Sequence, residues 1–204
     1  MSLSEDDALP APRKGWSLRE ITTLIALGAV FAVLYLGWVQ LWLVAQAAIG
    51  PLAMDIVFGF WFVVSIIAAR ILMKPGAALL SEVLAAGVQI LIGNPAGLLL
   101  LLTGLVQGAG AEVAFAATRW KRWGLGVCIA SGATAAVASF IYTWIRFNYG
   151  ALDPSLVASM AALRIASGAI LGGVLGWLIV EALYKTGALR GLPIDLARRG
   201  AGQA

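Results

Sequence analysis

Met73–Glu112 reads MKPGAALLSEVLAAGVQILIGNPAGLLLLLTGLVQGAGAE, which is two apolar segments joined by the uncharged turn Gly93-Asn94-Pro95. Two carboxylates and two amides interrupt these segments: Glu82, Gln89, Gln107 and Glu112. Ionisable groups are costly inside a membrane, so a sequence rarely keeps two carboxylates there without a use. We therefore expect the function to depend on these four groups and on the side chains that share their cavity.

The composition predicts that most of the chain lies in a lipid bilayer. Of its 204 residues, 61% are hydrophobic and 12% are charged, about half the charged fraction of an ordinary soluble domain. The chain has no histidine and one cysteine, which removes the commonest metal ligand and general base and excludes an internal disulfide. No catalytic motif or phosphate-binding loop is present, so we expect no enzyme activity, no metal and no cofactor.

Six apolar windows approach or exceed the about 20 residues that a membrane-spanning helix needs. They cover residues 21–43, 55–72, 76–93, 96–118, 124–146 and 156–184. We therefore expect an all-α integral membrane protein with six transmembrane helices in residues 21–185. Residues 1–20 would form a leader before this domain, and residues 186–204 would form a tail after it.

Basic residues alternate between the connections of these windows, which is typical of the positive-inside rule. One set of connections and the two termini hold Arg13, Lys14, Arg19, Arg70, Lys74, Arg119, Lys121, Arg122, Lys185, Arg190, Arg198 and Arg199. The opposite set holds only Arg146. The pattern predicts a multi-pass plasma-membrane protein with both termini in the cytoplasm, and it explains the net charge of +4 without a nucleic-acid partner.

The buried polar residues are expected to face one cavity. Glu82 and Gln89 are seven residues apart and so lie on one face of their helix. Arg164, inside the last window, would form an internal ion pair with Glu82 or Glu112. One cation cannot neutralise both acids, so a carboxylate remains for a ligand, a proton or a coupling cation. The outer part of the cavity would be closed by Asn94, Tyr142, Trp144 and Asn148.

Two further patterns each have two interpretations. Trp38 and Trp61, near the same outer face as Trp42, either belong to an interfacial aromatic belt or stack on a flat ligand. Residues 44–54 between the first two windows could fold over the mouth of the bundle. Small residues at three-residue steps in the first window either pack inside the protein or form a flat face for another membrane protein: Ala26, Ala29 and Ala32.

Several short motifs follow one another between residues 70 and 122: KPGAA at 74–78, Ser81-Glu82, Gly93-Asn94-Pro95, GLVQG at 104–108, and Gly110-Ala111-Glu112 with Phe115. Together they resemble the YkoE family, the substrate-binding (S) components of energy-coupling factor (ECF) transporters, an importer class of ABC transporters. The resemblance implies a six-helix bundle that captures thiamin or its hydroxymethylpyrimidine precursor at the outer face. It also implies docking, through the small residues of the first helix, on a transmembrane scaffold (T) component that carries two ATPase subunits.

Other functions remain open from the sequence. A stand-alone carrier could use Glu82 or Glu112 to couple transport to protons or cations. The same S-component fold could bind another vitamin such as riboflavin. An intramembrane enzyme or an assembly factor would also fit the composition.

Overall fold

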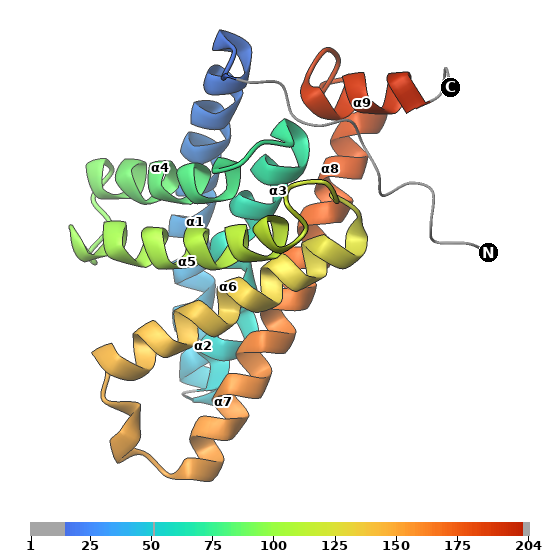
Figure 1. The fold of residues 1–204 in the computed structure, drawn as a ribbon. Helices are drawn as coiled ribbons and strands as arrows, with labels where there is room; N and C mark the ends of the chain where they lie inside the picture. Colours follow the sequence, from blue (N-terminus) through green and yellow to red (C-terminus); the bar gives the residue numbers. More distant parts are fainter. Residues whose placement is uncertain (1–14, 51, 202–204) are drawn as a thin grey trace.

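The computed structural model describes residues 15–50 and 52–201, and every regular element in that part of the chain is a helix (Figure 1). The elements are α1 Leu18–Ile49, α2 Leu52–Val57, η1 Phe58–Phe62, α3 Val63–Leu72, α4 Ala77–Leu91, α5 Leu99–Ala117, α6 Leu125–Arg146, η2 Tyr149–Ala151, α7 Pro154–Ser167, η3 Gly168–Val174, α8 Leu175–Lys185 and α9 Pro193–Ala201. The predicted all-α membrane architecture is confirmed at this level.

Within the described part of the chain, five helical stretches are long and apolar enough to cross a membrane: Leu18–Ile49, Leu52–Leu72, Leu99–Ala117, Leu125–Arg146 and Pro154–Lys185. The sixth predicted window, 76–93, forms α4, which has only 15 residues. At 1.5 Å per residue α4 is about 22 Å long, which is shorter than the about 30 Å of a hydrocarbon core. The structure therefore supports five candidate spans and one short apolar helix.

The ends of the first helix differ from the prediction. Ser17 and Glu20 form a capping box, in which each side chain bonds to the backbone N–H of the other residue, so α1 begins at Leu18 rather than at residue 21. The helix continues to Ile49 and takes in most of the first predicted outer connection. Residues 1–14 of the predicted leader and residues 202–204 of the predicted tail lie outside the described residues; α9 occupies part of that tail.

Small residues allow the helices to approach closely. In Figure 1, α4 and α5 run side by side and cross α1. A Cβ atom on Gly104 of α5 would lie 2.9 Å from the Cβ of Ala86 on α4. A Cβ atom on Gly132 of α6 would lie 2.0 Å from the carbonyl oxygen of Gly168 in η3. These contacts fix the helices around the site described below.

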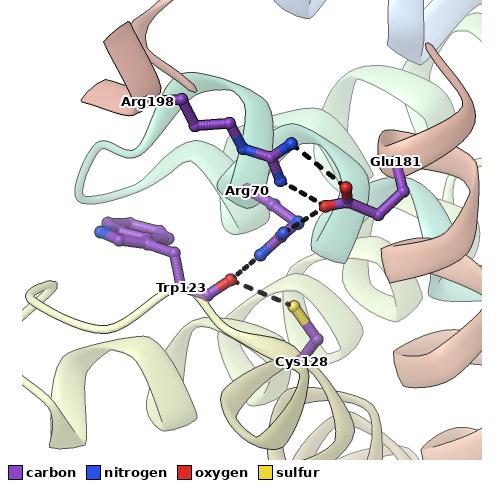
Figure 2. A network of polar contacts seen from close by, with 5 residues as sticks. All are labelled: Arg70, Trp123, Cys128, Glu181 and Arg198. Carbon is purple, nitrogen blue, oxygen red and sulfur yellow. Dashed lines mark hydrogen bonds and ion pairs between the residues drawn. The ribbon is translucent and has the colours of Figure 1, made fainter. Parts of the chain in front are cut away.

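The bundle has two ends, which we name by what lies there. At the terminal end, α1 and α6 begin and α3 and α8 finish, and a polar network joins α3, α8 and α9 to the start of α6 (Figure 2). Glu181 of α8 accepts from Arg70 of α3 and from Arg198 of α9, each at 2.5 Å. Arg70 also donates to the carbonyl oxygen of Trp123, just before α6, and the Cys128 thiol lies 3.8 Å from the same oxygen. The other end, where α1 and α6 finish, is the pocket end.

Candidate binding site

A cavity of about 240 Å³ opens at the pocket end between α1, the α2–η1 segment, α4, α5 and α6. Its polar lining comes from Glu82, Gln89, Asn94, Thr103, Gln107, Tyr142, Thr143 and Arg146, and its aromatic lining from Tyr35, Trp42, Phe58, Trp61 and Phe147. Three of the four polar groups in the two-helix stretch therefore share one chamber. Polar groups that converge in an otherwise apolar pocket are the usual sign of a small-molecule site.

Glu82 is the acidic residue of this chamber, and it is 2% exposed. The hydroxyl of Ser65 in α3 donates to its carboxylate at 2.9 Å, and the Tyr35 hydroxyl interacts with the same group. α5 can pass close to it because a Cβ atom on Gly108 would lie 3.1 Å from the Glu82 Cβ. None of the ion pairs among the described residues includes Glu82. The chamber thus holds a carboxylate with neutral hydrogen-bond partners.

The amides lie on two helices and on the turn that joins them. Gln89 on α4 and Gln107 on α5 are each 5% exposed. The Asn94 side chain in the turn donates to the side-chain Oε1 of Gln89 at 3.0 Å and accepts from the backbone N–H of Ala96 at 2.9 Å. These bonds tie the turn to α4 and hold two amides at the lining. Amides can donate and accept, so they suit a ligand with both kinds of group.

Some of the predicted aromatic residues line the cavity, and others lie outside its lining. Trp61 lines the cavity and contacts the Trp42 ring edge to face, with centroids 5.9 Å apart. Trp38 is outside the lining: its indole N–H donates to the Val57 carbonyl at 3.0 Å and its ring packs 4.3 Å from Phe60. Tyr142 is in the lining, whereas the predicted residues Trp144 and Asn148 are not.

Glu112 lies away from the cavity, which corrects the prediction that it shares the chamber. Its carboxylate accepts from the backbone N–H groups of Gly76 and Ala78 at 2.8 and 3.0 Å, and from the Trp120 indole at 2.6 Å. Gly76 precedes the first residue of α4, where backbone N–H groups have no partner within the helix. Glu112 therefore caps α4 at the terminal end.

Arg164 forms the predicted internal ion pair, but with Asp55 rather than with a glutamate. The two side chains are 2.5 Å apart and completely buried. Arg164 also donates to the Thr143 hydroxyl at 2.6 Å, and its guanidinium lies 4.0 Å from the centre of the Phe58 ring. Because Thr143 and Phe58 line the cavity, the Arg164–Asp55 ion pair lies directly behind the cavity lining. The charge of Arg164 is neutralised there.

The small residues of α1 do not form one exposed face. Ala26 is exposed, Ala29 is partly buried and Ala32 is fully buried. Steps of three residues in a helix drift around its axis, because a turn takes 3.6 residues. A Cβ atom on the nearby Gly28 would lie 3.0 Å from the Leu84 Cβ of α4. Ala32 is therefore a packing residue, which corrects its assignment to a docking surface.

Three comparisons with known proteins each match a membrane transport component. A family model described as "ABC-type cobalt transport system, permease component" matches residues 19–138. The chain is 42% identical over 181 residues to the protein named "Putative HMP/thiamine permease protein YkoE" of Bacillus subtilis (strain 168), which covers 89% of this chain and 91% of that one. A crystal structure of an S-component of an ECF transporter superposes with a TM-score of 0.85 and 40% identity, over 93% of this chain and 99% of that one.

These matches cover most of the chain and agree with its apolar helices and polar chamber. Proteins of this kind are membrane transport components and not enzymes. The chain therefore belongs to the YkoE family of ECF transporter S-components.

Proposed function

We propose that this protein captures thiamin or its hydroxymethylpyrimidine precursor for an ECF-type importer. The proposal rests mainly on Glu82, a buried carboxylate that forms no ion pair with any described cation and shares one chamber with the amides of Gln89, Asn94 and Gln107. The name of the Bacillus subtilis relative, an HMP/thiamine permease, supports the same substrate class.

The chemistry of these ligands matches the lining. Both carry an aminopyrimidine ring, whose exocyclic amine can donate to the Glu82 carboxylate and whose ring nitrogens can accept from an amide. Trp61 and Trp42 offer aromatic faces to a flat ring. Thiamin adds a thiazolium cation, which a carboxylate and aromatic rings both stabilise. Arg164 does not oppose this charge, because Asp55 pairs with it behind the wall.

The proposal places the pocket end outside the cell and the terminal end in the cytoplasm. Cations gather at the terminal end, where Arg19, Arg70, Lys74, Arg119, Lys121, Arg122, Lys185, Arg190, Arg198 and Arg199 lie on or beside the helix ends. Arg146 is at the pocket end. This asymmetry supports a plasma-membrane protein with cytoplasmic termini. Residues 1–20 and 186–204 would then be cytoplasmic, with α4 as the short sixth helix.

Transport would require partners that hydrolyse ATP, namely a T component with two ATPase subunits. A stripe on α1 supports a contact with the T component: Ala26, Val30, Val33 and Gly37 are all exposed and lie along one side of the helix. Small and β-branched residues allow a second transmembrane helix to approach closely.

The test is a titration of the full chain, purified in neutral detergent, with thiamin, hydroxymethylpyrimidine and riboflavin, followed by tryptophan fluorescence. Saturable binding of the first two and none of riboflavin is expected. Binding of riboflavin alone would assign another vitamin. Uptake into liposomes that contain only this protein would instead support the stand-alone carrier, because an S component needs its partners.

A further inference from the structure

A second pocket, of about 220 Å³, lies at the terminal end where α8 is followed by the loop to α9. Its charged lining comes from Lys185 at the end of α8, Arg190 in the loop, and Asp195 and Arg199 on α9. This pocket takes no part in the substrate site, which lies at the pocket end. Lys185 is also the last residue of a candidate span, so the pocket sits where that span would leave the membrane.

The pocket carries an excess of positive charge. Asp195 is 4% exposed, accepts from Arg199 at 3.0 Å and accepts from the Gly191 N–H at 2.7 Å. The Gly191 hydrogen bond lowers the pKa of Asp195, which keeps this carboxylate ionised. Among the described residues, no carboxylate lies within ion-pair distance of Lys185 or Arg190, although the charge of Arg190 also helps to lower the pKa of Asp195. Three cations and one carboxylate thus leave two positive charges uncompensated.

The loop that presents these cations has a defined conformation. Gly187 and Gly191 adopt φ angles of 77° and 73°, which favour glycine. Leu189 and Leu192 are buried at 5% and 4% exposure and anchor the loop on the bundle. The Arg19 side chain, from α1, donates to the carbonyl oxygen of Arg190. A Cβ atom on Gly187 would lie 3.3 Å from the Arg190 Nε, so glycine leaves room for the guanidinium to fold over the loop.

We propose that this pocket binds a phosphate group. The Arg190 guanidinium and the Lys185 ammonium line a pocket whose charged groups carry a net positive charge, and such groups match the charge and hydrogen-bonding capacity of a phosphate. The position at the end of a span brings the pocket to the depth of lipid headgroups. The phosphate group can therefore come from an anionic phospholipid or from a soluble phosphate, and the experiment separates the two.

The test compares the wild type with the double variant K185Q/R190Q, using the full chain in neutral detergent. The matched control is K121Q/R122Q, which removes two exposed cations at the same end but outside the pocket. One arm measures binding of inorganic phosphate by calorimetry. The other measures retention of phosphatidylglycerol against phosphatidylcholine by native mass spectrometry. Thiamin titration of each variant, expected to be unchanged, checks that the protein is folded.

The proposal expects the wild type and the control to bind at least one of the two phosphate probes. The variant K185Q/R190Q should weaken that binding by about tenfold or more, as loss of charge-assisted contacts does. Selective retention of phosphatidylglycerol assigns a lipid headgroup, and binding of inorganic phosphate assigns a soluble source. If neither probe binds the wild type, or if both double variants lose binding equally, the proposal is wrong.

If K185Q/R190Q does not fold, the single variants K185Q and R190Q, with K121Q as control, decide the question by the same criteria.

Discussion

Arg164 and Asp55 are paired at 2.5 Å with both side chains fully buried, and this pairing neutralises the cation that lies behind the wall of the neighbouring cavity. The only arginine in the middle of the last candidate span is satisfied by an acid on α2. Glu82, on the opposite side of the cavity wall, therefore keeps its carboxylate for a ligand. The predictions below test this division of roles.

Glu82→Gln should weaken ligand binding and leave the fold intact. Glutamine has the same shape but loses the charge, and a hydrogen bond to a charged group contributes about 1.5–3 kcal/mol. We expect thiamin affinity to fall by one to two orders of magnitude, as about 1.4 kcal/mol corresponds to tenfold. Calorimetric titration measures the affinity, and gel filtration checks the fold. Unchanged affinity would remove Glu82 from the site.

Glu112→Gln should show the opposite pattern. Loss of the charge weakens the cap that Gly76, Ala78 and Trp120 make with this carboxylate, and a helix cap contributes about 0.5–2 kcal/mol. Thermal unfolding in detergent should shift to lower temperature while thiamin affinity stays within twofold, about 0.4 kcal/mol. If thiamin affinity falls while thermal stability stays normal, Glu112 belongs to the ligand site after all.

Asp55→Asn should be strongly destabilising, because it leaves Arg164 as a buried charge without a partner. Removing one member of a buried ion pair costs about 3–5 kcal/mol, measurable by unfolding in increasing SDS. The double variant D55L/R164M removes both charges and should recover most of the loss. If the double variant loses as much stability as the two single substitutions together, the two residues do not act as a pair.

Gly132→Ala should destabilise the contact between α6 and η3. The added Cβ would lie 2.0 Å from the Gly168 carbonyl oxygen, and overpacking of this kind costs about 1–3 kcal/mol. Gly126, in the same helix, has no atom within 4 Å of such a Cβ, so Gly126→Ala is the control and should be neutral or slightly stabilising. Equal unfolding curves for the two variants would contradict the close helix contact.

The sequence was sufficient to predict the all-α membrane fold and the shared position of Glu82, Gln89 and Gln107. Seven-residue spacing and the adjacency of two helices determine that geometry. It could not predict the role of Glu112, because a carboxylate between apolar residues has the same sequence pattern whether it faces a cavity or caps a neighbouring helix. Asp55 was missed because it stands at the edge of an apolar window, and only the fold of the short α2 turns it toward Arg164.

The remaining lining residues depend on tertiary structure for the same reason. Tyr35 and Trp42 come from a helix of 32 residues, and periodicity alone does not show which of its sides meets the pocket. Arg146 reads as a loop cation in the positive-inside pattern, but the structure places it in the cavity lining. The alanine pattern of α1 was misleading at Ala32, where the contact with other helices of the same chain uses the small side chain.

The most direct test of the central claim is an experimental structure of the full chain with thiamin bound. The account predicts the aminopyrimidine amine within about 3.2 Å of a Glu82 oxygen, with the ring between the amides and Trp61. A ligand bound elsewhere, with Glu82 making only its contacts to Ser65 and Tyr35, would contradict it.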